Sequence, residues 1–191
     1  MTSVEILVDG FSLREASGVW HISSNVTLVH DDDILLLVDL GAPDRQQVLL
    51  DALNCHGIEP GDIDSIVLTH LHIDHVGALG LFPGTHIILP EGTATGSRLR
   101  FCNPTTLHPS PHTFVLRVPG HTTNDIALGL HSDDGTTTVV AGDLFPVDLN
   151  PDSPITAASL STLALSRQRV LDIADFIVTG HGPVLPVSHP R

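Results

Sequence analysis

The sequence predicts a layered α/β fold in which two β-sheets are covered by helices. Short apolar runs of strand length alternate with segments of helical periodicity, and clusters of turn residues separate them. Of the 191 residues, 41% are hydrophobic and 16% are charged, which is typical of an ordinary globular protein with a real core. No periodic repeat stands out. We therefore expect one domain that spans residues 1–191.

The first half of the chain alternates strand and helix patterns. Asp31, Asp32 and Asp33 form a turn signal before an apolar run. Pro43 suits the first turn of a helix, and Gly57 suits its end. The expected elements are two strands within 19–29, a strand at 34–38, a helix from 43 to 57, a strand at 63–68, a helix at 76–82 and a strand at 85–89.

The second half begins with a segment of different character. Residues 90–112 are rich in Pro, Thr, Gly and His with little periodicity, so we expect a long surface loop that serves as a lid or binding segment. The elements expected after it are strands at 114–118, 126–130 and 136–141, a helix whose apolar face runs from 160 to 174, and a strand at 176–178.

Composition argues against a strong nucleic-acid binder, a disulfide-rich protein and a membrane protein. Eight basic and 22 acidic residues give a net charge of −14, a field that repels nucleic acid unless metals or a local arginine patch reverse its sign. The two cysteines, Cys55 and Cys102, form neither a disulfide framework nor a thiolate metal site. The N-terminus lacks a signal-peptide pattern and no apolar run is long enough to span a bilayer, so we expect a cytoplasmic protein without membrane contact.

Residues 69–75 read T-H-L-H-I-D-H and follow a buried strand. In an extended chain alternate side chains share a side, so His70, His72 and Asp74 can converge on one point. His75 falls out of this register and can turn toward a second point nearby. Burying three imidazoles and a carboxylate together without a metal leaves groups unpaired, so the cluster predicts a metal site with room for two ions.

Further candidate ligands lie at strand ends, each beside a glycine: His121, Asp143 and His181. Glycine allows close approach, and a strand end holds a ligand rigidly. The full set contains five histidines and two aspartates and no sulfur. Such ligands favour two zinc ions, and iron or manganese is also compatible.

The order and spacing of these blocks resemble the metallo-β-lactamase superfamily, from Asp39-Leu-Gly to Gly180-His-Gly-Pro. The resemblance implies an αββα four-layer sandwich with the metals at the edge between the two sheets. It implies that His70, His72 and His121 hold one metal, that Asp74, His75 and His181 hold the other, and that Asp143 bridges them. It also matches Asp39 to the family's non-liganding aspartate, which orients a ligand or its loop.

The resemblance further implies a dinuclear-metal-dependent hydrolase. A hydroxide that bridges two metals about 3.5–4 Å apart would be the nucleophile at neutral pH, while the metals polarise the scissile bond. Asp143 would bridge the ions, and Asp74 could also orient the hydroxide. The acid for the leaving group is not evident, and His108, His112 and a metal-bound water are the candidates.

The substrate depends on residues outside the ligand set, because one fold and one metal core serve many chemistries. Lactamases with a sulfur ligand have cysteine at the position of Asp143, and the lactonases rely on a tyrosine, which this sequence lacks. Thioester hydrolases of the glyoxalase II type share the ligands but carry a further helical domain, whereas this sequence ends soon after His181. Persulfide dioxygenases, which use a single iron, remain a further alternative.

Three stretches outside the ligands, beginning at Gly80, Val139 and Ser166, resemble a branch of the superfamily associated with endonucleolytic cleavage of RNA, in particular histone pre-mRNA. This resemblance implies phosphodiester hydrolysis, and hydrolysis of a small thioester or ester is the alternative. The sequence leaves open whether the protein forms a homodimer. The weaker candidates for substrate binding are Arg98, Arg100, His108, His112 and Asn124, which stands where the family often has glycine.

Overall fold

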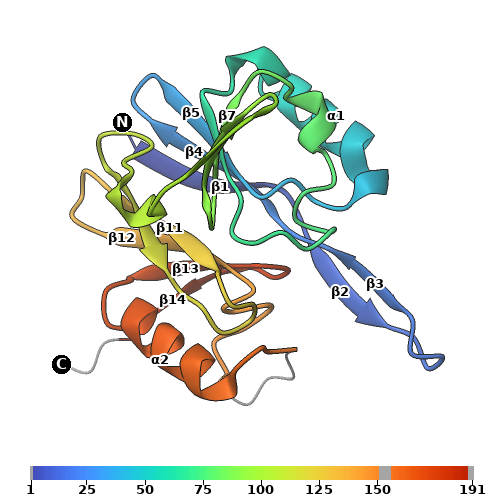
Figure 1. Ribbon diagram of the computed structural model, residues 1–191, viewed down its shortest axis with the longest axis vertical. Helices are drawn as coiled ribbons and strands as arrows, with labels where there is room; N and C mark the ends of the chain where they lie inside the picture. Colours follow the sequence, from blue (N-terminus) through green and yellow to red (C-terminus); the bar gives the residue numbers. More distant parts are fainter. Residues whose placement is uncertain (1, 151–155, 189–191) are drawn as a thin grey trace.

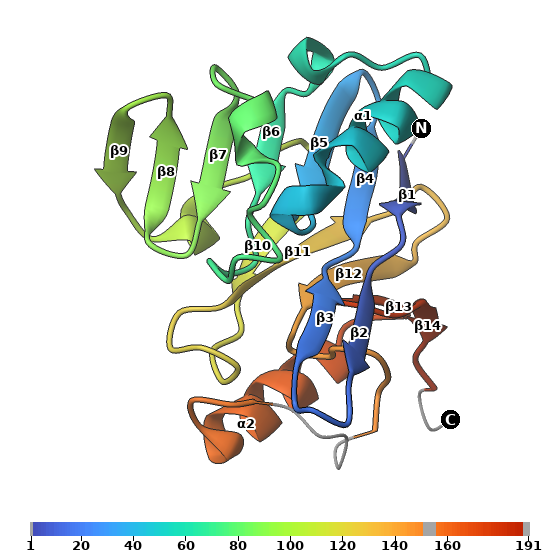
Figure 2. The ribbon, with the colours of Figure 1, turned by 90° about the vertical axis from the view of Figure 1, so that its right-hand side faces the viewer.

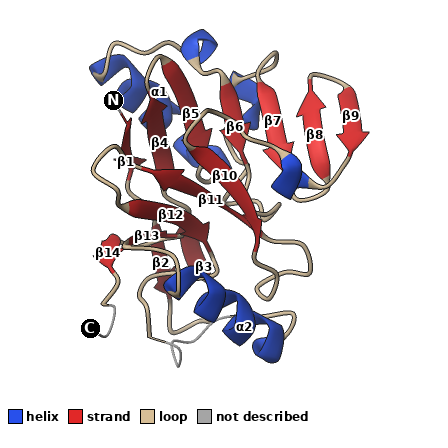
Figure 3. Ribbon diagram, turned by 90° about the vertical axis from the view of Figure 1, so that its left-hand side faces the viewer, coloured by secondary structure: helices blue, strands red, loops and turns tan. Residues whose placement is uncertain are grey.

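Two β-sheets lie face to face and carry helices on their outer faces (Figure 1). The structure is a computed structural model in which residues 2–150 and 156–188 are described. Helix α1 (Gln46–Cys55) covers the first sheet and helix α2 (Leu160–Leu171) covers the second, so the strands occupy the middle of the molecule (Figure 3). The expected αββα sandwich is therefore confirmed.

The first sheet has seven strands in the order β1-β4-β5-β6-β7-β8-β9. Their bounds are β1 (Thr2–Val8), β4 (Val26–Asp31), β5 (Ile34–Val38), β6 (Ser65–Val67), β7 (His86–Leu89), β8 (Gly92–Thr95) and β9 (Arg98–Phe101). Strands β5 and β6 are parallel, with Val38 opposite Val67. Because the carboxyl ends of parallel strands meet at one edge of a sheet, Asp39 and the segment 69–75 emerge side by side.

The second sheet has five strands in the order β10-β11-β12-β13-β14. Their bounds are β10 (Thr113–Arg117), β11 (Ile126–His131), β12 (Thr137–Gly142), β13 (Phe176–Thr179) and β14 (Val184–Pro186). Strands β12 and β13 are parallel, and Gly142 lies opposite Thr179. Asp143 and Gly180 therefore leave this sheet at neighbouring points of the same edge.

The core consists of three apolar layers. Residues such as Leu36, Val67 and Leu128 fill the space between the sheets. Leu49 and Leu53 pack α1 against the first sheet, and α2 is packed in the same way against the second sheet. Each of these leucines is at most 1% exposed, and burying such a side chain contributes about 1.5–3 kcal/mol. No helix among the described residues is long and apolar enough to cross a membrane.

A separate two-stranded hairpin, β2 (Phe11–Arg14) and β3 (Trp20–Ser23), projects from the sandwich (Figures 1 and 2). At its base the side-chain oxygen of Asn25 accepts a hydrogen bond from the Gly10 amide. The side-chain Nδ2 of Asn25 donates to the carbonyl oxygens of Thr179 and Gly182. The hairpin is thus tied to the loop that carries His181.

Two expected elements are wrong. Residues 76–82 do not form a helix, and only a short 3-10 turn is present at Leu79–Leu81. The reason is a close packing of backbones: the Gly77 amide donates to Gly41, and a Cβ at Gly77 would overlap the backbone of Ala42 and Pro43. Tertiary contacts override the helical spacing.

The segment 90–112 is also not an irregular loop. It forms the antiparallel pair β8 and β9 around a tight turn in which Gly96 has a positive φ, followed by the 3-10 turn Pro104–Thr106. Glycine is the residue that such a turn favours. Strands β1, β2 and β14 were not expected from the sequence. The remaining expected strands and both long helices are present within a few residues of their expected bounds.

Candidate metal centre

Three imidazoles meet at one point, two from the T-H-L-H-I-D-H segment beside the first sheet and one from the second sheet. Nε2 of His70 lies 2.9 Å from Nδ1 of His72. Nε2 of His121, which follows β10 of the second sheet, lies 3.0 Å from the same His72 atom. These three nitrogens and a carboxylate oxygen of Asp143 lie within 4.8 Å of one another, so they form one candidate set of metal ligands.

A second set lies beside the first and consists of Asp74, His75 and His181. Nε2 of His75 lies 3.5 Å from Oδ2 of Asp74. Asp143 lies between the two sets, because its Oδ1 is 3.0 Å from Nε2 of His181 and its Oδ2 is 3.3 Å from Nε2 of His121. One carboxylate thus presents an oxygen to each set.

Four atoms of this centre are buried without a hydrogen-bond partner among the described residues: Asp74 Oδ2, His75 Nε2, Asp143 Oδ1 and His181 Nε2. Buried polar atoms are almost always paired, and leaving one unpaired costs about 1–3 kcal/mol. All four point into the same space, where imidazole and carboxylate donors suit a divalent ion. The residues therefore fit the metal that the ligand pattern implies.

The outer nitrogens of the imidazoles are held by other groups. Nδ1 of His121 lies 2.7 Å from the Thr156 carbonyl oxygen, and Nδ1 of His181 lies 2.8 Å from the Ser23 carbonyl oxygen. A ring that donates its Nδ1 hydrogen to a carbonyl leaves its Nε2 lone pair free for a metal, which is the usual arrangement of metal-binding histidines.

Asp39 orients a third imidazole, that of His75, and joins it to the residue Thr69 that follows β6. Its Oδ2 lies 2.8 Å from Nδ1 of His75, and its Oδ1 accepts a hydrogen bond from the Thr69 amide. The Thr69 hydroxyl also donates to Asp39 Oδ2. Asp39 has a φ of 57°, an unfavourable backbone conformation for a residue other than glycine, which is retained because these contacts determine it.

The electrostatics of the first set match metal binding. Burial, together with the neighbouring His75 and His121, holds the pKa of His70 far below its usual value, so this imidazole is neutral. Burial and the proximity of His121 also lower the pKa of His72. Neutral imidazoles are the form that binds a metal.

The second set combines charges of opposite sign. Burial opposes ionisation of Asp143, yet His75 and His181 hold the pKa of Asp143 well below its usual value. Burial likewise opposes protonation of His75, but Asp39 and Asp143 raise the pKa of His75 well above its usual value. A metal that binds here must displace protons from the imidazoles.

Close backbone packing positions the loops that carry these residues. Gly142 has a positive φ, and a Cβ there would overlap Thr69. A Cβ at Gly180 would overlap Oδ1 of Asp143. From α2, the Ser166 hydroxyl donates to the Pro119 carbonyl and Nε of Arg167 donates to the Leu144 carbonyl. Helix α2 thus fixes the loops that carry His121 and Asp143.

The weaker candidates for substrate binding lie away from this centre. Arg98 and Arg100 are exposed on β9, the outer strand of the first sheet. His108 contacts the Thr113 carbonyl, and His112 contacts Asp31, both at the ends of strands remote from the metal edge. Because the segment forms a hairpin at the sheet edge, these four residues are not brought together with the ligand sets, and a role in substrate binding stays a prediction. Asn124 is exposed and lies 3.4 Å from Glu91.

A pocket of about 220 Å³ opens directly over the centre. His121, Asp143 and His181 form part of its lining. The rest of the lining is made by Ser12, Trp20, Ile22, Pro146 and Thr156. These residues were not predicted from the sequence, although Trp20 is the only tryptophan in the chain, and the residue is 48% exposed.

Comparisons with known proteins agree with this geometry. Metallo-beta-lactamase domain-containing protein 1 of Xenopus laevis is 33% identical over 188 residues, which cover 95% of this chain and 80% of the relative. The chain belongs to the metallo-β-lactamase superfamily. The sequence profile of that superfamily matches residues 20–95, which include the first strand-end cluster. In the human protein of the same name, the matched region covers 58% of that protein's length.

Other members of the superfamily are similar as well. A hydroxyacylglutathione hydrolase of Stenotrophomonas maltophilia is 34% identical over 161 residues, which cover 75% of this chain and 57% of that enzyme. The crystal structure of a putative metallo-β-lactamase from Thermotoga maritima has a TM-score of 0.74 at 20% identity and covers 97% of this chain and 99% of that one. The superfamily and these relatives are metallohydrolases, so this chain carries the fold and the candidate ligands of a metallohydrolase.

Proposed function

We propose that this protein is a dinuclear metallohydrolase that cleaves a small ester or thioester. The observation that supports the proposal is the pair of ligand sets that share Asp143 at the floor of a small, partly apolar pocket. Two divalent ions would supply Lewis acidity, which lowers the pKa of water to about 7 and polarises the scissile carbonyl. Zinc fits the imidazole and carboxylate ligands best, and iron and manganese are compatible with them.

Three groups of the chain would have distinct roles in this reaction. The first set, His70, His72 and His121, would hold one ion, and Asp74, His75 and His181 would hold the other. Asp143 would hold both through its two oxygens, which already face the two sets. Asp74 would orient the attacking water, because its Oδ2 is buried at the centre without a hydrogen-bond partner among the described residues.

The pocket favours a small substrate over a polymer. Trp20, Ile22 and Pro146 form an apolar wall, and a volume of about 220 Å³ accommodates an acyl group rather than a folded nucleic acid. Phosphate binding depends on basic side chains, yet Arg98 and Arg100 lie on a distant edge strand and the net charge is −14. A thioester or ester carbonyl placed over Asp143 would meet both ligand sets.

Cleavage of an RNA phosphodiester is the second candidate. The resemblance of the sequence to an RNA-cleaving branch of the superfamily implies this activity. One observation on the structure favours it, since a half-exposed indole beside the metals is a surface on which a nucleotide base could stack.

A direct comparison of substrates tests these proposals. Zinc- and manganese-loaded protein is assayed against a 4-nitrophenyl ester, a glutathione thioester and single-stranded RNA of about 20 nucleotides. We expect hydrolysis of the ester and thioester and little cleavage of the RNA. Cleavage of RNA alone, with no ester turnover, would replace the first candidate by the second.

Two ligand variants, Asp143→Asn and His121→Ala, test the centre itself. Each removes one ligand, so we expect turnover to fall by about 1,000-fold or more while the fold is retained. His56→Ala is the matched control, because His56 is an exposed histidine at the end of α1. Wild-type rates in either ligand variant would show that the centre lies elsewhere.

A further inference from the structure

The two faces of the β2–β3 hairpin carry different side chains. In its register Ser12 pairs with Ile22 and Arg14 pairs with Trp20. Since alternate side chains of a strand point to opposite faces, these four residues share one face. Ser12, Ile22 and Trp20 line the pocket over the metal centre. Arg14 therefore belongs to the face that looks toward the pocket.

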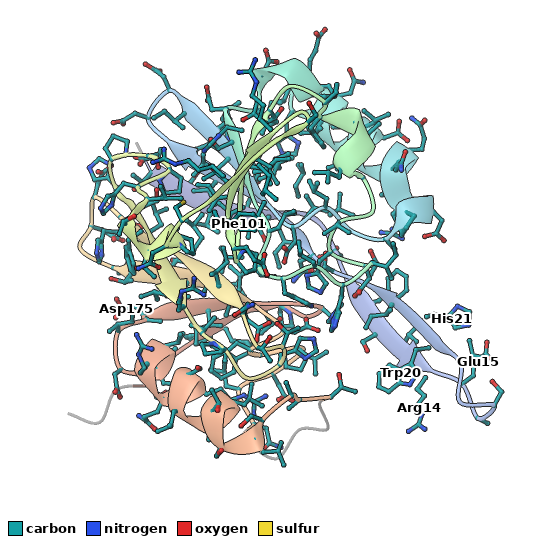
Figure 4. The ribbon with its side chains drawn as sticks, in the orientation of Figure 1. Arg14, Glu15, Trp20, His21, Phe101 and Asp175 are labelled. Carbon is teal, nitrogen blue, oxygen red and sulfur yellow. The ribbon has the colours of Figure 1, made fainter. Side chains whose placement is uncertain are left out.

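Arg14 is held against the pocket wall by Trp20. Its guanidinium carbon lies 5.6 Å from the centre of the indole ring, which is within the range of a cation–π contact. Figure 4 shows Arg14 and Trp20 on one side of the hairpin, with His21 and Glu15 on the other. The cation is thus placed beside the apolar part of the pocket.

The neighbouring carboxylate does not neutralise this cation. Oε1 of Glu15 lies 2.6 Å from Nε2 of His21, and Oε2 of Glu15 accepts a hydrogen bond from the Ser17 hydroxyl. The contact with His21 holds Glu15 on the opposite face. Within the described part of the chain, no carboxylate forms an ion pair with Arg14. The guanidinium is therefore available to a ligand.

The order of side chains along the hairpin defines a path away from the two ligand sets. The base of the hairpin is at the centre, because the Ser23 carbonyl accepts from His181. Arg14 and Trp20 lie two residues farther toward the tip than Ser12 and Ile22, which is about 7 Å. A substrate leaving the metals would pass Ile22, then the indole, and then the guanidinium.

We propose that Arg14 binds an anionic group at the end of the substrate remote from the scissile bond. This proposal rests on the proposed function and adds the substrate class: an ester or thioester with an apolar middle and an anionic tail. The net charge of −14 repels anions in general. A single cation at the pocket mouth would therefore select and orient such a tail.

A matched pair of esters tests the role of Arg14. The substrates are 4-nitrophenyl octanoate and the mono-4-nitrophenyl ester of octanedioic acid, which differ by one terminal carboxylate. We expect Arg14→Ala to lower kcat/KM for the anionic ester about tenfold, mainly through KM, and to leave the neutral ester within about twofold. Arg45→Ala is the control, since Arg45 lies over Phe11 on the opposite face of the hairpin.

A binding measurement separates this proposal from the proposed function. Trp20 is the only tryptophan, so tryptophan fluorescence reports on this face alone. We expect 1-octanesulfonate to change the fluorescence of the wild type and of Arg45→Ala in a saturable way. Arg14→Ala should respond only weakly, and 1-octanol should give similar curves with all three proteins.

The outcomes are distinct. If neither these esters nor the glutathione thioester is hydrolysed, the proposed function fails, and the fluorescence titration still decides the role of Arg14. If Arg14→Ala lowers both esters equally, or binds octanesulfonate as tightly as the wild type, Arg14 is not the anion site. Displacement of octanesulfonate by single-stranded RNA at far lower concentrations would overturn the small-substrate class and assign the face to a polynucleotide.

Discussion

Individual residues at the centre are fixed as much by what surrounds them as by their own chemistry. The ligand types and their spacing were evident in the sequence because His and Asp follow apolar strands. The groups that orient them were not, since His121 and His181 contact the backbone carbonyls of Thr156 and Ser23, and a backbone carbonyl has no sequence signature. Asp39 was an exception, because its side chain does the orienting.

Replacing Asp39 by Asn should weaken metal binding at the second set. The variant loses the negative charge that faces Nδ1 of His75, while most of the volume is kept. Losing such an orienting carboxylate typically costs about 10–100-fold in metal affinity. Titration calorimetry of the metal-free protein with zinc measures the change in metal affinity. An unchanged affinity for both ions would contradict the role given to Asp39.

Gly180→Ala should disrupt the position of Asp143. A Cβ at residue 180 would overlap Oδ1 of that carboxylate, and a shift of a catalytic group by about 1 Å can lower the rate about 100-fold. Gly84→Ala is a suitable control, because a Cβ at Gly84 has no neighbour within 4 Å. Ester hydrolysis and circular dichroism are measured together. Equal activity in the two variants would show that Gly180 has no positioning role.

At the scale of elements, the sequence was informative where a pattern had one physical meaning. The apolar run at 34–38 forms β5, and the helical spacing between Pro43 and Gly57 contains α1. Prediction from the sequence failed where tertiary packing determines the local structure. The apolar residues of 76–82 have helical spacing, but the Gly77 backbone is bonded to Gly41 instead. The polar segment 90–112 has little apolar periodicity, since its strand β9 is exposed throughout.

One contact between elements should make stability depend on pH. Nδ1 of His112, just before β10, lies 2.7 Å from Oδ1 of Asp31 at the end of β4. The hydrogen bond and the charge of Asp31 raise the pKa of His112. A raised pKa in the folded state stabilises the protein below the unfolded-state pKa of about 6.5, and this contribution is lost as pH rises through the folded-state value.

His112→Ala should therefore destabilise the protein more at pH 5.5 than at pH 8.5. Urea unfolding of the wild type and the variant at both pH values gives the two differences in free energy. The exposed His86→Ala serves as a reference for a histidine that contacts a hydroxyl, that of Thr95, rather than a carboxylate. If the variant lost more unfolding free energy at pH 8.5 than at pH 5.5, the result would contradict the ion pair between His112 and Asp31.

In the molecule as a whole, the candidate metal centre lies between the two halves of the sandwich. His70, His72, Asp74 and His75 follow a strand of the first sheet, whereas His121, Asp143 and His181 follow strands of the second. An ion held by both groups would link the sheets at their common edge. Metal binding should thus stabilise the entire fold rather than one loop.

Removing the metals should lower the melting temperature of the whole protein. A ligand present at about 100 times its Kd stabilises the folded state by about 2.7 kcal/mol, so a chelator should remove at least this amount for each tightly bound ion. Calorimetry with and without chelator measures the shift. Asp143→Asn should show a smaller shift, because it binds metal less well. Identical melting curves with and without chelator would argue against a structural link between the sheets.

The central claim is that two ions held by these seven residues carry out hydrolysis. Metal analysis of the purified protein, combined with ester hydrolysis during stepwise addition of zinc to the metal-free form, tests it most directly. We predict two ions per chain and activity that rises mainly with the second equivalent. One iron per chain, with no hydrolysis in zinc- or manganese-loaded protein, would contradict the claim.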